Sequence, residues 1–381
     1  MKIGIDARFL GPEGTGIGTY LRELLKALEK IDQENQYLVL MRRRNWEHYI
    51  PSNPNFKKIA AEAQWYTIEE QLKMPRLLNK HRCDLYHFGH FNVPILWRGA
   101  FVVTIHDIIL HKFKTREATT RSPLIYEVKN LVYRRLLDYA IRASRMILVP
   151  SLATKEAVLE LRQVPAAKIA VTYEAADKKF FRWSHQEVSL NDREYLNHKY
   201  HLPDKYFLYA GNAYPHKNVI SVLRALRKCP TANFAHICSN ADNIFYRRMQ
   251  QAARDLGVAA RCYFPGSVTE QDLPLVFKGS QAYIFPSLLE GFGLPAIEAQ
   301  AAGVPLLCSN AKPLPEVVGE GALYFNPIDP GDIADKINLF LNSKVLAERL
   351  VARGFINANR YSWEKTATQT LAVYKKAVNV S

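Results

Sequence analysis

The sequence predicts an α/β protein with two parallel-sheet domains, and three observations lead to that prediction. A chain of 381 residues is too long for one core of ordinary size. It begins with a short apolar run, a glycine-rich loop and a helix, and the same order restarts at Tyr206. Because strand, loop and helix form the repeating unit of parallel sheets, each half is expected to build its own sheet.

The first domain is predicted to span residues 1–180. A strand at Lys2–Asp6 leads into a loop with glycines at 11, 14, 16 and 18, and a helix follows in which leucines recur at helical spacing from Leu21 to Leu28. Thr19 stands three positions after Gly16, so the loop does not fit G-x-G-x-x-G, which argues against a nicotinamide dehydrogenase. Further strands are expected at 37–41, 84–88, 101–105, 146–150 and 168–173, with a helix at 151–161.

The second domain repeats this order. Residues 181–200 carry many charges and no apolar periodicity, so they are interpreted as a linker into a domain at 201–361. That domain opens with the strand Tyr206–Ala210 and the segment GNAYPHKN, before a helix that begins at Val219. Further strands are expected at 233–238, 261–264 and 282–285, with helices near 243–256 and 270–279. The last segment, 362–381, is predicted to be an amphipathic helix capped by Ser362.

The most informative segment is Tyr283–Asn310, in which a strand, a glycine corner, a helix and a second strand follow one another. Gly291 and Gly293 allow a sharp turn and a close approach of a ligand to the backbone. Pro295 suits the first position of a helix. The amides of residues 292–296 would then point out of the helix start, where they can bind a phosphate.

Two carboxylates flank this predicted anion site. Glu290 precedes the turn, and Glu298 lies about one turn into the helix. Carboxylates accept hydrogen bonds from hydroxyl groups, so a sugar joined to a nucleoside diphosphate would supply both kinds of partner. The alternative is structural: an ordinary helix cap with a glutamate that stabilises the helix dipole.

The spacing of Glu290 and Glu298 resembles the E-x7-E signature of the retaining glycosyltransferases of family 4, and the surrounding PSLLEGFGLPAIEAQAAGVPLLCSN resembles that motif nearly throughout. The resemblance implies the GT-B fold, with two Rossmann-like domains facing a deep cleft and the last helix crossing back to the first domain. It also implies an acceptor-binding first domain and a second domain that binds a nucleotide-sugar. IGIDAR, GIGTYLRELL and VVTIHD are similar to the subgroup of bacterial O-polysaccharide mannosyltransferases.

The resemblance implies roles for individual residues of the second domain. Glu290 would hold the hydroxyls of the transferred sugar and Glu298 those of the ribose, while Lys217 meets the charge of the departing diphosphate. Family members commonly carry arginine where this chain has Asn212, so Lys217 would carry more of that work, together with His216. The donor-binding set also contains the corner residues Gly291, Phe292, Gly293 and Leu294, and a base-pocket segment Gly266, Ser267 and Val268.

Three positions in the first domain complete the predicted site. In the family a histidine at the end of the strand predicted at 101–105 contacts the donor sugar, and His106 matches it. The loop with Gly16 and Gly18 would approach the donor phosphates and the acceptor. A structural histidine and a plain tight turn are the respective alternatives. The predicted catalytic residues are therefore His106, Glu290 and Lys217.

Composition limits the cofactors and the compartment. No D-x-D occurs in the chain, so the usual ligands of a metal-bridged diphosphate are missing, and an enzyme without metal or cofactor is expected. The five cysteines are widely spaced and form no CxxC, which indicates a reducing compartment rather than zinc or a disulfide framework. No apolar run is long enough to span a membrane, and Asp6 and Arg8 come too early for a signal peptide. A cytoplasmic protein is expected.

The net charge of +15 suits an anionic ligand, a nucleic acid or an anionic membrane surface. Residues 112–145 contain nine Lys or Arg and three acidic residues, interleaved with apolar side chains. Such a stretch can lie peripherally on the inner face of the cell membrane, where a lipid-linked acceptor would be met, or it can be a solvated helix face. Nucleic acid is not expected, because the aromatic residues fall in predicted core strands rather than in one basic groove.

The predicted activity is transfer of a hexose onto a glycan or lipid-linked saccharide in surface polysaccharide synthesis, with mannose from GDP-mannose favoured by likeness to the subgroup. A UDP-sugar donor of the glucose or N-acetylglucosamine type is the first alternative, and a UDP-sugar epimerase, which needs no acceptor, is the second. A retaining outcome could come from a covalent carboxylate intermediate, or from attack by the acceptor on the same face of the sugar from which the nucleotide leaves. The latter is favoured, because Glu290 is assigned to the sugar hydroxyls.

Overall fold

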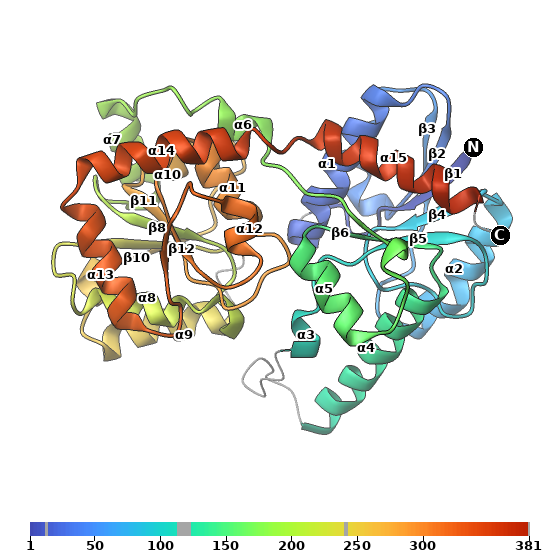
Figure 1. The fold of residues 1–381 in the computed structure, drawn as a ribbon, viewed down its shortest axis with the longest axis horizontal. Coiled ribbons are helices and arrows are strands. Elements are labelled where there is room, and N and C mark those ends of the chain that lie inside the picture. The colour runs from blue at the N-terminus through green and yellow to red at the C-terminus, as the bar shows by residue number, and fades with distance from the viewer. Residues whose placement is uncertain (12–13, 113–122, 240–242, 380–381) are drawn as a thin grey trace. The chain divides into compact units, whose positions relative to one another are not determined.

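The structure, a computed structural model, describes residues 1–11, 14–112, 123–239 and 243–379, and the chain separates into two compact units (Figure 1). Among the described residues, the first unit takes those up to Glu174 together with those from Ser362 onward, and Ala175–Tyr361 forms the second. Each unit contains one parallel sheet with helices packed on it. The prediction of an α/β protein with two sheets is confirmed.

The sheet of the first unit has seven strands in the order β3-β2-β1-β4-β5-β6-β7. The strands are β1 Lys2–Asp6, β2 Gln36–Met41, β3 Phe56–Ala60, β4 Leu85–Phe88, β5 Phe101–Thr104, β6 Met146–Val149 and β7 Ile169–Val171. The helices are α1 Thr15–Ile31, α2 Ile68–His81, α3 Ile109–Lys112, α4 Pro123–Ala143, α5 Leu152–Leu161 and α15 Trp363–Asn379, with the 3-10 turns η2 Arg43–His48 and η4 Ala166–Lys168.

Strand β1 lies inside this sheet and pairs in parallel with β2 and β4, so that Ile3 lies between Tyr37 and Leu85. The order of the strands reverses between β1 and β4. Strands β4, β5 and β6 are buried throughout, as their mostly apolar sequences predict. In open α/β sheets, the loops that follow the strands at such a reversal form the ligand-binding edge.

The C-terminal helix α15 packs within the first unit, against α1 and the strands β4, β5 and β6 (Figure 1). Ser362 caps its start by accepting a hydrogen bond from the amide of Lys365 at 3.2 Å. Thr366 donates from its hydroxyl to the carbonyl oxygen of Tyr173 at 2.5 Å. The prediction that the last helix returns to the first domain is confirmed.

The sheet of the second unit has six strands in the order β10-β9-β8-β11-β12-β13, which reverses between the paired strands β8 and β11. The strands are β8 Phe207–Ala210, β9 Phe234–Ile237, β10 Cys262–Gly266, β11 Ala282–Phe285, β12 Leu306–Ser309 and β13 Leu323–Phe325. The helices are α6 Lys178–Phe181, α7 Leu190–Tyr200, α8 Val219–Leu226, α9 Ile244–Asp255, α10 Leu273–Gly279, α11 Leu294–Ala301, α12 Leu314–Val318, α13 Pro330–Leu341 and α14 Lys344–Ala358, with the 3-10 turns η5 Pro215–Lys217 and η6 Ala259–Arg261.

The boundary between the units differs from the predicted one. The first unit ends at Glu174 rather than at 180, and the predicted linker 181–200 belongs to the second unit, where it contains α7. This helix buries only Leu196 and Tyr200, which explains the missing apolar periodicity. Its start is fixed by a capping box between Ser189 and Asp192 instead.

Some elements start elsewhere or have no predicted counterpart. Helix α1 begins at Thr15, so Gly16 and Gly18 lie in its first turns and not in a loop. Strands β3 and β13 lie at sheet edges and are only partly buried, so they lack the continuous apolar run of an inner strand. Helix α2, which follows β3, was also not predicted.

The basic stretch 112–145, predicted to contact an anionic membrane, lies partly outside the described residues: nothing is described for 113–122, nor for the side chains of 112 and 123–129. In the described part of α4, Leu131 is 56% and Val132 50% exposed. Arg142 donates to a carboxylate oxygen of Asp138 at 3.0 Å. No helix within the described ranges is long and apolar enough to cross a membrane.

Candidate active site

Two loops of the second unit meet at the reversal of its strand order. The loop after β8 carries Lys217, and the loop after β11 carries Glu290. The ammonium of Lys217 donates to both carboxylate oxygens of Glu290, each at 2.8 Å. The side chains keep exposures of 22% and 8% respectively, so the pair is open to a ligand on one side. Two of the three predicted catalytic residues are thus brought together.

Hydrogen bonds to backbone carbonyl oxygens also join these two loops. The amide of Leu288 donates to the carbonyl oxygen of His216 at 2.8 Å. Asn218 has a left-handed φ of 57° and donates to the carbonyl oxygens of Pro286 at 3.1 Å and Pro327 at 2.7 Å. Asparagine adopts this conformation more readily than most residues. The ion pair is therefore supported by a framework of its own loops, not only by its mutual attraction.

The corner after Glu290 requires glycine at one of its two glycine positions. Gly293 is the N-cap of α11 with φ of 99°, a left-handed conformation that favours glycine. A Cβ atom there would lie 2.8 Å from Cδ2 of Leu314 and 3.2 Å from the ring of Phe285. Gly291 has no positive φ, so its own backbone conformation does not demand glycine.

The start of α11 presents backbone amides that have no partner inside the helix. The prediction that the amides of residues 292–296 are all open to an anion is wrong at two positions: Pro295 has no N–H, and the N–H of Ala296 donates to the carbonyl oxygen of Gly293 at 2.9 Å. Phe292 is buried, with its ring centroid 5.7 Å from that of Tyr361. The amides of Gly293 and Leu294 are the best placed for a phosphate group.

Glu298 lies in α11, about one helical turn after the corner, and is half-buried. Its charge and that of Glu290 act on the same phenol: burial raises the pKa of Tyr283 most, and Glu298 and then Glu290 raise it further. The hydroxyl of Tyr283 donates to the carbonyl oxygen of Ala210, at the end of β8, at 3.0 Å. Both carboxylates of the E-x7-E pattern therefore lie near one point of the sheet edge.

The other residues of the β8 loop add no second cation to this edge. His216 stacks on Tyr214 with ring centroids 6.0 Å apart. Burial and the charge of Lys217 lower the pKa of His216 to about 4, so it is neutral near pH 7 and offers a diphosphate hydrogen bonds rather than the expected charge. The carbonyl oxygen of Asn212 accepts from the hydroxyl of Tyr209 at 2.9 Å.

The loop after β10 is tied to the centre of the sheet by two residues that the sequence does not signal. Tyr246 of α9 accepts from the amide of Gly266 at 2.9 Å and donates to the carbonyl oxygen of His236 at 3.0 Å. His236, fully buried in β9, lies with Nε2 3.0 Å from the carbonyl oxygen of Gly211. These contacts connect the loops after β8 and β10. An inward tyrosine on an amphipathic helix looks like an ordinary core residue, so no pattern reveals this role.

The predicted base-pocket segment follows the edge strand of the same sheet. Gly266 ends β10 with φ of 79°, and the exposed Ser267 and half-buried Val268 come next. Two strand spacings separate β10 from β8, which places this loop about 10 Å to the side of the ion pair. That separation suits a base on one side and a diphosphate on the other, although the base-binding role stays a prediction.

In the first unit, His106 follows β5, next to the strands that flank the reversal. Its Nδ1 lies 3.1 Å from Oε1 of Glu174, and its Nε2 lies 3.0 Å from the carbonyl oxygen of Gly89. The ring packs edge-on against Tyr20 with centroids 4.7 Å apart. Burial alone would lower the pKa of His106, but Glu174, the Gly89 carbonyl and Asp107 raise it above its ordinary value. Glu174 carries no motif that would have singled it out.

Gly16 and Gly18 differ in what surrounds them at the start of α1. A Cβ atom on Gly16 would meet nothing within 4 Å, and the residue is exposed, so there is room for a ligand beside it. A Cβ atom on Gly18 would lie 3.0 Å from the carbonyl oxygen of Phe9 and 3.1 Å from that of Gly11. Gly18 therefore serves the packing of the helix on the preceding loop.

A buried ion network joins the residues after β1 to helix α2. Arg8 donates to Asp6 at 2.8 and 2.7 Å, to Glu70 at 2.6 Å and to the carbonyl oxygen of Ala63 at 3.0 Å. Glu70 also accepts from the amide of Asn92 at 2.8 and 2.7 Å. All four side chains are buried. Burial raises the pKa of Glu70, while Arg8 and Asn92 oppose that rise.

This network shapes a loop that presents two aromatic residues. The amide of Tyr66 donates to Oε2 of Glu70 at 2.9 Å, and Tyr66 has φ of 62°, which is uncommon for an aromatic residue. Tyr66 is 52% exposed. Trp65 stacks on Phe9 with ring centroids 4.5 Å apart. A strained backbone that holds an exposed ring in place is a reason to look for a function there.

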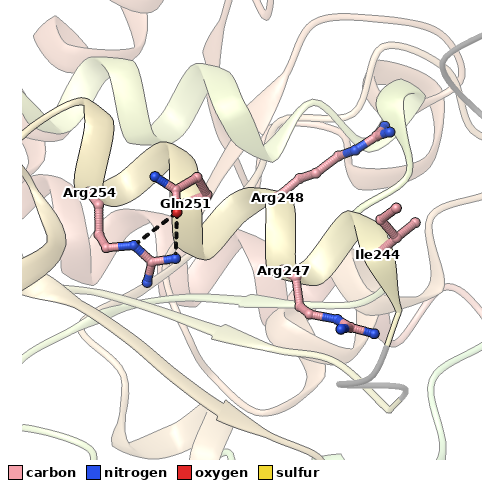
Figure 2. Close-up of a pocket in the computed structure, with 5 residues that line it drawn as sticks. All are labelled: Ile244, Arg247, Arg248, Gln251 and Arg254. Atoms are coloured by element: carbon pink, nitrogen blue, oxygen red, sulfur yellow. Dashed lines mark hydrogen bonds between the residues drawn. The ribbon is translucent and has the colours of Figure 1, made fainter.

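A hollow of about 450 Å³ lies on the surface of the second unit over α9. It is lined by Ile244, Arg247, Arg248, Gln251 and Arg254 (Figure 2). Figure 2 shows Arg247 and Arg248 pointing in different directions, and Arg254 donates to Gln251 at 3.2 and 2.7 Å. The guanidinium groups do not converge on one point, and no predicted site residue lines the hollow.

Comparison with known families divides the chain in the same way. The model described as Glycosyltransferase Family 4 matches residues 14–180, and the model described as Glycosyl transferases group 1 matches residues 194–356. The chain is a family 4 glycosyltransferase. The first match contains His106, and the second contains both loops of the Lys217–Glu290 pair. The predictions of the family and of an enzyme are confirmed.

This family 4 glycosyltransferase is similar to O-antigen chain mannosyltransferase B of Escherichia coli, with 29% identity over 95% of this chain and 96% of that protein. It is 25% identical to O-antigen chain mannosyltransferase RfbU of Salmonella typhimurium, over 84% of this chain and 85% of that one. The solved structure of sucrose-phosphate synthase from Thermosynechococcus elongatus matches with a TM-score of 0.77 at 18% identity and covers 100% of both chains. The GT-B fold class is confirmed.

Proposed function

We propose that this glycosyltransferase moves mannose from GDP-mannose onto a glycan or a lipid-linked saccharide in the synthesis of a surface polysaccharide. The observation that carries the proposal is the Lys217–Glu290 ion pair at the strand reversal of the second sheet, beside the amides that start α11. The O-antigen mannosyltransferases among its relatives support the choice of mannose and of a polysaccharide product.

The second unit would hold the donor. A diphosphate can bind the ammonium of Lys217 and the first amides of α11, because both offer hydrogen bonds to an anion. Once Lys217 turns to the phosphate, Glu290 can accept hydrogen bonds from the hydroxyls of the sugar. Glu298, near the same edge, would accept those of the ribose. The ion pair therefore offers Lys217 to the diphosphate and Glu290 to the sugar.

The proposed transfer is retaining, by attack on the face from which the nucleotide leaves. This mechanism is favoured because Glu290, once Lys217 has turned to the phosphate, would accept hydrogen bonds from the sugar hydroxyls, which weakens the carboxylate as a nucleophile. The proton NMR spectrum of the first product formed gives its anomeric configuration. A β-mannoside from an α-linked donor would contradict retention.

The first unit would hold the acceptor. Trp65 and Tyr66 present aromatic rings at the carboxyl edge of its sheet, and the apolar face of a hexose packs on such rings while its hydroxyls bond at the rim. His90 lies beside Tyr66, with 6.0 Å between the ring centroids. Tyr66→Ala is expected to raise the KM for a saccharide acceptor about tenfold, with the affinity for the nucleotide unchanged. An unchanged KM would remove Tyr66 from the acceptor site.

The proposal needs no metal ion, because Lys217 and the amides after Glu290 supply the positive groups that the departing diphosphate requires. Within the described ranges, no three His, Cys, Asp or Glu side chains are grouped so that they could hold a metal. Transfer activity in EDTA is expected to equal that in buffer alone. A loss that magnesium restores would contradict this part of the proposal.

A lipid-linked acceptor would bring the protein to the inner face of the cell membrane as a peripheral protein. The exposed Leu131 and Val132 of α4, within the basic stretch 112–145, support contact with anionic lipid. Sedimentation with vesicles that contain phosphatidylglycerol tests this contact. Binding that is absent at low salt would contradict it.

The decisive experiment compares thermal stabilisation by GDP, UDP, ADP, GDP-mannose and UDP-glucose. A ligand at 100 times its Kd stabilises the fold by about 2.7 kcal/mol, so GDP and GDP-mannose are expected to give the largest shifts in Tm. Glu298→Ala should abolish the shift, whereas the matched change Glu348→Ala, at an exposed position of α14, should keep it. Larger shifts with UDP and UDP-glucose would indicate a UDP-sugar donor in place of GDP-mannose.

A further inference from the structure

His106, which is partly exposed, differs from the buried His87 and His90 of the first unit in the chemistry of its partners. A carboxylate oxygen of Glu174 lies 3.1 Å from Nδ1 and the carbonyl oxygen of Gly89 lies 3.0 Å from Nε2. Both oxygens can only accept hydrogen bonds. A neutral imidazole has one N–H and would turn a lone pair toward one of them. The imidazolium ion donates to both.

His87 provides an internal comparison. Its Nδ1 lies 2.6 Å from the hydroxyl of Tyr374, and its Nε2 lies 2.8 Å from that of Thr104. Hydroxyl groups donate or accept, so a neutral ring satisfies both contacts. Burial, and then the charge of His106, lower the pKa of His87 to about 3. The protein thus surrounds one histidine with partners that suit the neutral form and another with partners that suit the cation.

The charged and titratable groups around His106 agree with this assignment. Burial lowers the pKa of His106, and Glu174, the Gly89 carbonyl and Asp107 outweigh it. Burial, followed by the charge of His106, lowers the pKa of His90 to about 3, so His90 is neutral. Tyr20, the ring against His106, has its pKa raised by burial and also stays neutral. Glu174 is therefore the anion in direct hydrogen-bond contact with the ring.

We propose that Glu174 is a positioning residue for glycosyl transfer, which holds His106 as a cation whose two N–H groups are both bound to the protein. Glu174 is suited to this role because its side chain is only 6% exposed, and the chain passes into the second unit directly after it. With both N–H groups occupied, His106 acts as a fixed positive charge and not as a proton donor or base. Such a charge suits an anionic group of a substrate bound at the carboxyl edge of the first sheet, so this consequence rests on the proposed function.

The protonation state itself is measured without any substrate. Nitrogen NMR of protein labelled with 15N-histidine, with the His106 signal assigned from its absence in His106→Gln, should show both ring nitrogens protonated at about pH 7. In Glu174→Gln the ring should lose one proton at that pH. A neutral His106 in the wild-type protein, or a titration that Glu174→Gln does not move, would overturn the proposal even if sugar transfer is confirmed.

The kinetic consequence is a change in the pH profile and not only in the rate. For Glu174→Gln, the alkaline limb of kcat/KM is expected to move to lower pH by about one unit, a tenfold loss on the alkaline side that shrinks as the pH falls. Glu174→Asp, which keeps the charge, should restore the wild-type limb. The control Glu47→Gln changes an exposed glutamate of η2 and should leave the profile unchanged. An equal loss at every pH would show a merely structural role and overturn the proposal.

Nucleotide binding separates this inference from the proposed function. Glu174 belongs to the first unit, so Glu174→Gln should keep the shift in Tm produced by GDP. If no nucleotide stabilises even the wild-type protein, the proposed function fails while the NMR titration still decides the state of His106. If the titration fails and nucleotides bind, only the role of Glu174 is lost.

Discussion

The two sheets share the order 3-2-1-4 around their first strands, but they treat the charged residues at the reversal differently. At the end of β1, the network of Asp6, Arg8 and Glu70 is buried and each charged group makes several hydrogen bonds. After β8 and β11, Lys217 and Glu290 have each other and an open side. A saturated buried network fixes a shape, whereas a half-open pair can exchange its partner for a ligand. The charged residues make the first edge rigid, and at the second edge they are available for binding.

The largest expected effect tests the rigid edge. Arg8→Met leaves two buried carboxylates without their cation and should lower the free energy of unfolding by about 3–5 kcal/mol. Urea unfolding, followed by tryptophan fluorescence, measures the loss. As a control, Arg353→Met breaks an exposed pair with Glu320 and should cost less than about 1 kcal/mol. Equal losses in the two variants would contradict the comparison.

The next effect tests the binding edge. Glu290→Gln keeps the shape of the side chain but removes the charge that faces Lys217, and it should lower kcat about 100-fold or more. Its stability should change little, because the pair is partly exposed. Transfer rates and the GDP-induced shift in Tm are measured on the same sample. A variant with normal kcat would exclude Glu290 from the reacting site.

A smaller effect separates the two predicted glycine positions. Gly293→Ala should destabilise the protein by about 1–3 kcal/mol, since the backbone is left-handed and the new methyl group meets Leu314. Gly16→Ala, in open space within α1, should stabilise it by about 0.5–1 kcal/mol. Thermal unfolding measures both. Lower activity in a stable Gly16→Ala variant would support a ligand beside Gly16; destabilisation by this change would contradict the open space.

The smallest expected effect per residue is the pH dependence of the folding stability. Burial lowers the pKa of His87 and His90 to about 3 and, in the second unit, that of His216 and His236 to about 4. Because the unfolded chain takes up these protons first, their contribution to stability is complete above about pH 6.5 and falls as the pH falls toward the folded pKa, by about 1 kcal/mol each at pH 5.5. The value of Tm should drop over this range.

The contribution of His106 to the folding stability changes with pH in the opposite direction. Its folded pKa is raised, so its contribution is present below the ordinary pKa and is lost as the pH rises through the raised value. The profile of Tm against pH should therefore have a maximum near neutrality. A Tm that is constant between about pH 4 and 7 would contradict the neutral state of these four histidines.

The sequence predicts most of the second unit, because its inner strands are short apolar runs and its corner depends on local chemistry. The range 282–285 coincides with β11, and Gly293 has the left-handed φ that a glycine corner suggests. The prediction of a linker at 181–200 is wrong for a local reason as well, because α7 buries so few residues that its sequence shows no apolar periodicity. The edge strands β3 and β13 were not predicted, because a partly buried strand has a mixed pattern of apolar and polar residues.

The family, the two parallel sheets and the carboxylates of the E-x7-E pattern can be predicted from the amino-acid sequence, because each depends on short contiguous segments. The pairs of charges that meet appear only in the folded protein: Lys217 with Glu290, 73 positions apart, and His106 with Glu174, 68 positions apart. The physical reason is that parallel strands bring their carboxyl ends to one edge, so the partners of a side chain depend on strand order and not on distance along the chain.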